Sequence, residues 1–202
     1  MRHLHRPLCT ATGPYCQGGF TFVELMVTLV IAILLTAIAV PQYTNFVKTQ
    51  QSVAEINNLL NDMRYARSEA LKEGQFVSLC VSSNGTGCTP GVWNTGWIIY
   101  ANPGFTVAAP GFVTGTSVLL RVQTGFTNSD TITSTPATTN ITYNRDGFGV
   151  GLSPTTGELF TLHNTPAVTA ATRCLWLDVL GHQYIQTAAQ AAATGQGANL
   201  CS

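Results

Sequence analysis

The sequence predicts an α+β protein with one long helix followed by an antiparallel β-sheet. The first observation is an apolar run from Phe20 to Val40, in which Glu24 is the only charged residue. The second is an apolar repeat at three and four residues that continues to Glu73, which is typical of a helix with one apolar face. The third is a change to a period of two after Gly74, which is typical of β-strands. The 202 residues therefore divide into a leader, one helix and a β-rich head.

Residues 1–19 precede the apolar run and contain two basic residues, Arg2 and Arg6. A secretory signal peptide has a shorter apolar region followed by a cleavage site of small residues. Here the basic segment ends in Gly18-Gly19, and the apolar run comes after it. Positive residues favour the cytoplasmic side of a membrane. One interpretation is an uncleaved signal anchor, and the other is a leader peptide that is removed.

Residues 20–41 are expected to form the membrane and assembly half of the helix. A run of 21 residues spans roughly 31 Å, enough for the hydrocarbon of a bilayer. A charge at the centre of such a helix costs roughly 2.5–3.5 kcal/mol, so Glu24 needs a partner. A cut between Gly19 and Phe20 would create a new α-amine. If two processed helices pack in a staggered arrangement, the Glu24 carboxylate of one can meet the α-amine of the other, and in a medium of low dielectric constant this pair is favoured over either charge alone. We therefore expect Glu24 to be a docking charge for another subunit.

Pro41 is expected to kink the helix, because its ring removes the hydrogen bond to the carbonyl of Ala37. A helix end at Pro41 is the alternative. The helical pattern resumes in residues 42–73, an amphipathic half that Gly74 is expected to end. A helix from Phe20 to Glu73 would be about 80 Å long. The apolar positions of the second half are Val53, Ile56, Leu59, Leu60, Met63, Ala66, Ala70 and Leu71.

The opposite face of residues 42–73 is charged, and we expect it to be solvated rather than to form a site. Its charged residues are Lys48, Glu55, Asp62, Arg64, Arg67, Glu69, Lys72 and Glu73.

Residues 74–202 are expected to form the β-rich head. The strand candidates are "QFVSLCV", "VWNTGWIIYA", "SVLLRVQ", "NITYN", "GELFTL" and "RCLWLDV". In the second of these, Trp93, Thr95 and Trp97 would share one face. A hairpin is expected around Asp146-Gly147. The stretches "TNSDTITSTPATT" and "NTPAVTAATR" are predicted to be exposed loops, and "TAAQAAATGQGAN" to be floppy unless Cys201 is fixed.

The head contains four cysteines, an even number that indicates disulfides in an oxidising compartment. Three pairings are possible. We favour Cys80–Cys88 around the turn "SSNGTG", and Cys174–Cys201, which would fix the C-terminus. The alternative is a zinc site with four thiolates, against which the absence of a C-x2-C pair argues.

The head shows no pattern typical of an enzyme, a cofactor site or a metal site. Its histidines, His163 and His182, do not lie next to a Cys or Ser motif that indicates a nucleophile. A calcium site needs several clustered oxygens, whereas the acidic residues of the head are scattered singly. They are Asp130, Asp146, Glu158 and Asp178. We therefore expect no catalytic residue, no cofactor and no metal.

Charge argues against nucleic acid as a partner. After Gly74 the chain contains three arginines, Arg121, Arg145 and Arg173, and no lysine. Affinity for DNA rests mainly on neutralisation of phosphates by lysine and arginine, so one or two contacts hold DNA poorly at physiological salt.

The stretch Gly19-Phe20-Thr21-Phe22-Val23-Glu24-Leu25 resembles the processing motif of type IV pilins and type II secretion pseudopilins. The resemblance implies that a prepilin peptidase cuts between Gly19 and Phe20 and methylates the new N-terminal amine of Phe20. It also implies that Glu24 contacts the N-terminus of a neighbouring subunit during filament assembly. The partners would be other pilins or pseudopilins, the peptidase and the inner membrane.

Within this superfamily, "MRYARSEALKEGQFVSLCVS", Cys88 and "WNTGWIIY" resemble the GspH/FimT family of minor pilins and pseudopilins. The resemblance implies a pilin-like fold, a periplasmic head and a low-abundance subunit that primes the pilus or sits at its tip. The alternative is the minor pseudopilin of a type II secretion system. Some members bind DNA in natural transformation through a Gly-Arg-x-Arg motif. The corresponding stretch here, from Gly181 to Gln186, has no arginine, which argues against this third function.

Overall fold

The computed structural model describes residues 20–104, 111–194 and 201. The chain divides after Gln42 into two compact units, Met1–Gln42 and Tyr43–Ser202. The leader, residues 1–19, lies outside the described residues, and with it Gly19. The α+β fold class predicted from the sequence is confirmed, since one long helix precedes strands that pair only in antiparallel fashion.

Helix α1 is a single helix, Phe22–Glu73, that includes Pro41. The alternative of a helix end at Pro41 is therefore wrong, while the kink stays a prediction. Gly74 follows the helix with a φ of +61°, a left-handed conformation that suits glycine and ends helices.

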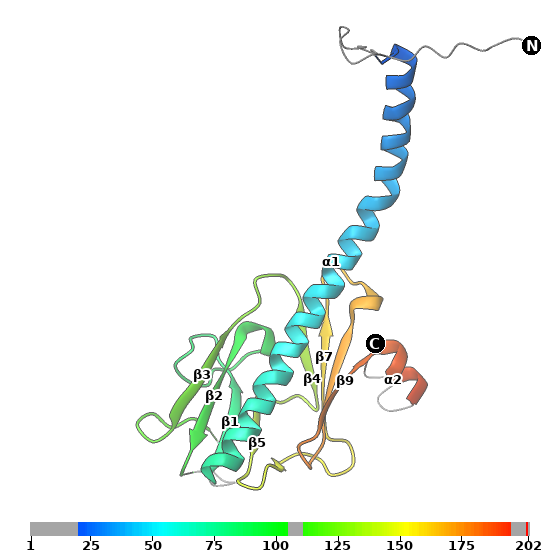
Figure 1. Cartoon of the computed structure of the whole chain (residues 1–202). Helices are drawn as coiled ribbons and strands as arrows, with labels where there is room; N and C mark the ends of the chain where they lie inside the picture. Colours follow the sequence, from blue (N-terminus) through cyan, green and yellow to red (C-terminus); the bar gives the residue numbers. More distant parts are fainter. Residues whose placement is uncertain (1–19, 105–110, 195–200, 202) are drawn as a thin grey trace, which may run out of the picture. The chain divides into compact units, whose positions relative to one another are not determined.

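In the second unit, the strands form two antiparallel sheets where the sequence had indicated one (Figure 1). The first sheet has the order β3-β2-β1-β5-β6 and the second has the order β4-β7-β8-β9. The strands of the first sheet are β1 Phe76–Val81, β2 Gly96–Asn102, β3 Val118–Thr124, β5 Asn140–Tyr143 and β6 Gly149–Val150. The strands of the second sheet are β4 Thr131–Thr135, β7 Glu158–His163, β8 Arg173–Leu177 and β9 Gln183–Thr187.

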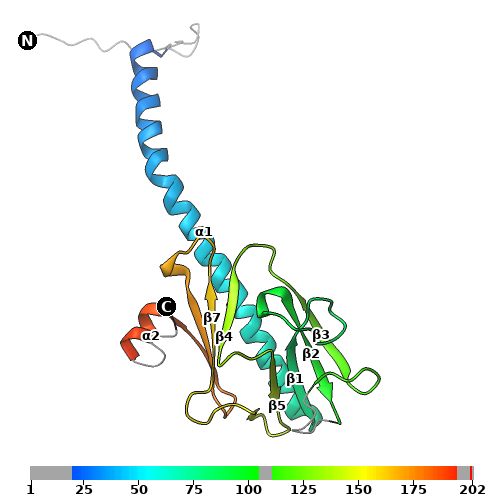
Figure 2. The same ribbon diagram turned by 180° about the vertical axis from the view of Figure 1, so that it is seen from behind.

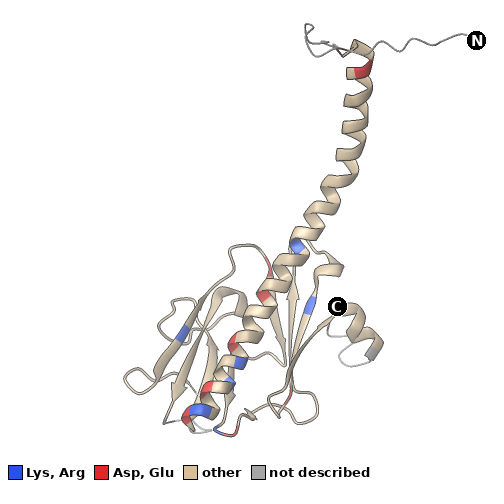
Figure 3. Ribbon diagram, viewed as in Figure 1, with Lys and Arg blue, Asp and Glu red and all other residues tan. Residues whose placement is uncertain are grey.

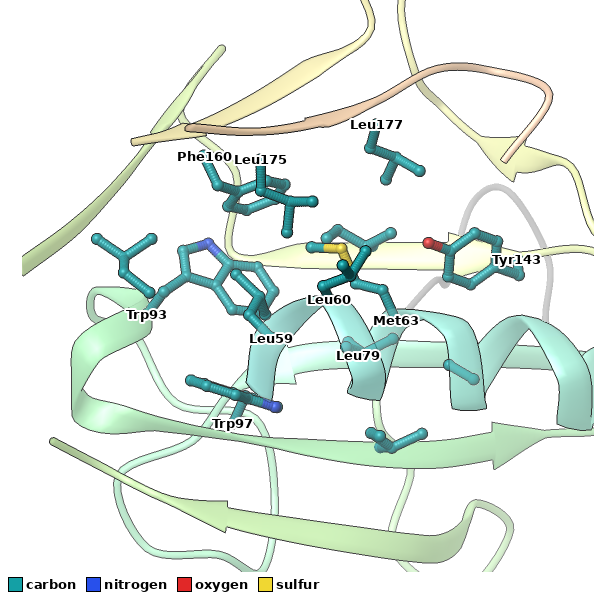
Figure 4. Packing of buried hydrophobic residues seen from close by; sticks show 14 of the residues in the cluster. Leu59, Leu60, Met63, Leu79, Trp93, Trp97, Tyr143, Phe160, Leu175 and Leu177 are labelled. Atoms are coloured by element: carbon teal, nitrogen blue, oxygen red, sulfur yellow. The ribbon is translucent and has the colours of Figure 1, made fainter. Parts of the chain in front are cut away.

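The core of the second unit lies between α1 and the two sheets (Figure 4). Leu59 and Met63 of α1 are fully buried there, together with Leu79 of β1 and Phe160 of β7. The ring of Trp93 meets that of Phe160 edge-on, with centroids 5.4 Å apart. The part of the apolar repeat from Ile56 to Ala70 thus provides the helix face that both sheets share, whereas Leu71 is 52% exposed.

Two expectations for the head are corrected by the structure. Trp93 and Thr95 belong to the 3₁₀ helix η1, Trp93–Thr95, and not to the strand that holds Trp97. The predicted loop "TNSDTITSTPATT" contains β4, whose Ile132 is buried in the core. The segment "TAAQAAATGQGAN", expected to be floppy unless Cys201 is fixed, contains β9 residue Thr187 and then helix α2, Ala188–Thr194, and Cys201 is fixed by a disulfide. Residues 195–199 of this segment lie outside the described residues. A second 3₁₀ helix, η2 Thr169–Ala171, lies in the other predicted loop.

The expected hairpin around Asp146-Gly147 is confirmed by the pairing of β5 with β6, in which Tyr143 lies opposite Gly149. Gly147 has a φ of +80°, which a hairpin turn requires of one of its residues.

The structure contains the two disulfides that we favoured from the sequence. Cys80 is joined to Cys88 at a Cα–Cα distance of 5.6 Å, and Cys174 is joined to Cys201 at 5.9 Å. Cys174 and Cys201 form a small buried cluster with Leu159 of β7 and Ala191 of α2. The second disulfide therefore holds the end of the chain against the second sheet.

Candidate assembly site

Helix α1 begins with a capped first turn that contains Glu24. The Oγ1 atom of Thr21 accepts a hydrogen bond from the backbone N–H of Glu24 at 3.2 Å, and the Thr21 carbonyl accepts one from Leu25 at 3.1 Å. Thr21 is thus the N-cap, and Glu24 is the third residue of the helix. A carboxylate at this place interacts favourably with the positive end of the helix dipole.

The role of Thr21 is a feature that we missed from the sequence. The pattern Thr-x-x-Glu directly before an apolar run is typical of a capping box, and it could have predicted the helix start at Phe22.

Glu24 makes no ion pair within the described part of the chain. The residue is exposed, and no other charged residue occurs between Phe20 and Gln42 (Figure 3). Any cation that neutralises this carboxylate must therefore come from residues outside the described ones or from another molecule.

The first half of α1 presents apolar side chains on all its faces. Every large apolar side chain from Phe20 to Val40 is at least 50% exposed. Thr28 and Thr36 do not interrupt this surface, because their hydroxyls donate to the carbonyls of Leu25 and Ile33, each at 2.9 Å. Among the described residues, α1 is the one helix long and apolar enough to cross a membrane. An exposed apolar surface of this extent indicates contact with lipid or with other proteins.

In the second unit, Asp62 corrects the expectation that the charged face of α1 is solvated. Asp62 is 4% exposed, and its two carboxylate oxygens accept hydrogen bonds from Trp97 and Arg121. The guanidinium of Arg121 also lies over the ring of Tyr65, 4.9 Å from its centroid. This face of the helix is therefore partly an internal contact with the first sheet.

Glu55 belongs to a second polar network. Its Oε1 atom accepts a hydrogen bond of 2.6 Å from Asn128, which also donates to Asp130. Asp130 accepts further bonds from Asn164 and from the backbone N–H of Thr165. Burial, together with the neighbouring charge of Asp130, raises the pKa of Glu55 to about 7. Among the described residues, no group of three or more His, Cys, Asp or Glu side chains could hold a metal ion.

The stretch from Gly181 to Gln186, which contains no arginine, begins in a tight turn. Arg67 of α1 donates to the carbonyls of Gly181 and Leu180 at 2.7 and 2.9 Å. His182 donates its backbone N–H to Asp178 at 2.8 Å, and its ring nitrogen Nδ1 lies 3.0 Å from the same carboxylate. This turn is thus held by contacts within the chain.

The three arginines of the head lie on separate segments, and each contacts its own chain. Arg121 on β3 pairs with Asp62, and Arg173 on β8 donates to two backbone carbonyls. Arg145, in the turn between β5 and β6, lies over the ring of Phe76 at 5.7 Å. Figure 3 shows that charges gather along α1 and are sparse over the sheets.

The chain combines an exposed apolar helix segment, with a cap and a carboxylate in its first turn, and an α+β head. This combination defines a pilin-like protein. A family model described as "Type II transport protein GspH" matches residues 55–181, more than half of the chain. A second model, "Prokaryotic N-terminal methylation motif", matches residues 15–40. The chain belongs to the GspH family. This confirms the resemblance found in the sequence and the structural role of a pilin or pseudopilin that it implied.

The chain is also similar to individual proteins. Fimbrial protein Q of Moraxella bovis is 30% identical over 136 residues, which cover 66% of this chain and 83% of that protein. Type IV major fimbrial protein FimA of Dichelobacter nodosus is 38% identical over 64 residues, 32% of this chain and 39% of that protein. The crystal structure of the type IV minor pilin FimU of Pseudomonas aeruginosa, in space group P21, is similar at a TM-score of 0.49. The two sequences are 22% identical, and the matched region covers 71% of this chain and 92% of the FimU chain.

Proposed function

We propose that this protein is a minor type IV pilin, a subunit that primes the pilus or sits at its tip. A prepilin peptidase cuts between Gly19 and Phe20 and methylates the amine of Phe20. The mature chain is anchored in the inner membrane by residues 20–41, with its head in the periplasm, and it then enters the filament through contacts with other pilins.

One observation carries the proposal: Glu24 lies in the first turn of an exposed apolar helix and has no ionic partner among the described residues. The amine of Phe20 on a neighbouring subunit is the cation that processing would supply. At an effective dielectric constant of about 20, two unit charges 4 Å apart attract by about 4 kcal/mol. Apolar contacts along the remainder of the helix add to this attraction.

The experiment compares incorporation of the full-length chain into sheared pili in its native bacterium. Glu24→Ala and Glu24→Gln should both leave the head folded and strongly reduce incorporation, because each removes the docking charge. Glu73→Ala is the matched control, since Glu73 is an exposed carboxylate near the other end of the same helix. Wild-type incorporation of both Glu24 variants would contradict the docking role.

Thr21→Val separates docking from helix formation. It removes the side-chain cap, at a cost of about 1 kcal/mol, but leaves the carboxylate of Glu24 in place. We expect this variant to enter pili. If Thr21→Val and Glu24→Gln lose incorporation equally, Glu24 acts by starting the helix.

The second candidate is a minor pseudopilin of a type II secretion system, which the description of the matching family model favours. The similarity to two fimbrial proteins favours the pilus. Deletion of the gene distinguishes the two functions. Fewer pili with normal secretion are expected for a minor pilin, whereas lost secretion with normal piliation would establish the pseudopilin.

A further inference from the structure

Strand β3 forms one edge of the first sheet. All its register partners lie on β2, from Gly96 opposite Thr124 to Ala101 opposite Val118. In the parts of the chain that the structure describes, no strand pairs with its other edge, and both views show β3 outermost in its sheet (Figures 1 and 2). Such an edge presents free backbone N–H and C=O groups that can pair with another chain.

One side of this edge is apolar. Leu119 and Val122 are 41% and 45% exposed, although they lie opposite the fully buried Tyr100 and Ile98. Edge strands are usually protected from association by charged side chains, proline, bulges or short length. β3 contains neither lysine nor proline; its one charged residue, Arg121, is paired with Asp62, and its pairing with β2 shifts register between Ile99 and Tyr100.

The other side of the edge is polar. A surface pocket of about 350 Å³ lies there, lined by the polar side chains of Asn58, Asn61 and Asp62 of α1 and of Arg121 and Gln123 of β3. Asp62 has both oxygens engaged, whereas Arg121 donates through Nη1 and has further N–H groups. Asn58 and Asn61 are exposed, and each side-chain amide carries both N–H donors and an acceptor oxygen. The remaining N–H groups of Arg121 therefore suit a carboxylate or amide oxygen of a partner.

Two copies of β3 are poorly suited to pair with each other. Arg121 is the central residue of Val118–Thr124, so symmetric antiparallel pairing over the full length of the strand would place two arginines directly opposite. Like charges in that position destabilise a strand pair.

We propose that the free edge of β3 accepts an extended segment of a different subunit of the same filament, a proposal that rests on the proposed function. The segment adds a strand to the sheet. Since side chains alternate between the two faces of a strand, its apolar residues cover Leu119 and Val122. The intervening residues are acidic or amide side chains that enter the pocket beside Arg121.

The test places the photo-cross-linking residue benzoylphenylalanine at position 119 of the full-length chain in the native bacterium. A second strain carries the same probe at Ile31, on the apolar half of α1, as a control for assembly. We expect the probe at 119 to form an adduct with another pilin-like protein, at a peptide in which apolar residues alternate with acidic or amide residues.

Two second-site variants test the two sides of the edge. Val122→Lys should abolish the adduct, and Gln123→Glu should reduce it because it repels an acidic side chain. Val92→Lys is the matched control, since Val92 is a 50% exposed valine outside β3, and it should leave the adduct unchanged.

Three results would overturn the proposal. An adduct only with a second copy of this chain would contradict a heterologous strand. Adducts from position 31 without any from position 119 would contradict the proposal that the edge of β3 is an interface. They would not contradict the proposed function. No adducts from either position would contradict the proposed function itself, and the edge proposal with it.

Discussion

The indole Nε1 of Trp97 donates a hydrogen bond of 2.8 Å to Oδ2 of Asp62. The other carboxylate oxygen accepts from Nη1 of Arg121 at 2.5 Å. Because Trp97 and Asp62 are buried, this network joins α1 to β2 and β3 inside the head. A charge on the nominally polar face of the helix is thus part of what holds the helix to the sheet.

Asp62→Ala should lower the free energy of unfolding by about 2–3 kcal/mol, because it removes two hydrogen bonds that involve a charged group and leaves the indole N–H of Trp97 unpaired. Urea unfolding of the purified full-length chain in detergent measures this value. Glu73→Ala is the control on the exposed face, with an expected change within about 0.5 kcal/mol. Equal effects of the two substitutions would show that Asp62 contributes no more than a solvated residue.

Glu158→Gln should stabilise the head at alkaline pH. Burial raises the pKa of Glu158 from its ordinary 4.5 to about 7, and Oε1 has no hydrogen-bond partner among the described residues. The folded state thus binds the proton more tightly than the unfolded state, so the stability contributed by Glu158 is complete below about pH 4.5 and is lost as the pH rises through about 7.

Thermal unfolding followed by circular dichroism provides the measurement for Glu158. The Tm of Glu158→Gln should exceed that of the wild type by at least about 2 °C at pH 8.5, and by less at pH 5. Glu73→Gln, the same substitution at an exposed carboxylate, serves as the matched control. A difference that is the same at both pH values would contradict the buried, unpaired carboxyl.

The disulfide Cys174–Cys201 should stabilise the head more than Cys80–Cys88. The two bridges close loops of 27 and 8 residues, for which loop-closure entropy gives about 3.5 and about 2.5 kcal/mol. Unfolding in urea of the two double Cys→Ser variants compares them directly. A larger loss for the Cys80→Ser/Cys88→Ser variant would refute this order.

Arg67→Lys should cost about 1 kcal/mol, because a lysine ammonium cannot donate to two successive carbonyls as the guanidinium fork does. Arg64→Lys is the same substitution one turn away on the exposed face of the helix, and it should be nearly neutral. Urea unfolding of both variants measures the difference. Indistinguishable curves would mean that the turn at Gly181 does not depend on Arg67.

The helix and most strands could be predicted from the sequence because their periodicity is a local property. The 3₁₀ helix at Trp93 could not, since Thr95 donates back to the carbonyl of Val92 instead of continuing a strand. β4 was missed because Ile132 is the one large apolar residue in "TITST". The division into two sheets depends on which distant strands pair, and local patterns do not contain that information.

The position of Glu24 in the first helical turn could be predicted because the motif around it is compact, while its docking role stays a prediction. The burial of Asp62 was not predicted, because its partners Trp97 and Arg121 lie 35 and 59 residues further along the chain. A carboxylate on a polar helix face gives no local sign that a distant indole will meet it. Arg67 was assigned to the solvated face for the same reason, since its carbonyl partners lie more than 110 residues away.

The mass of the mature N-terminus tests the central claim most directly, because Glu24 acquires its partner only if processing exposes the amine of Phe20. The native protein is isolated from membranes and its N-terminal peptide is analysed by mass spectrometry, with Gly19→Ser as the unprocessed control. The proposed function predicts a chain that begins at Phe20 with one methyl group on its amine. A native protein that still carries residues 1–19 would contradict it.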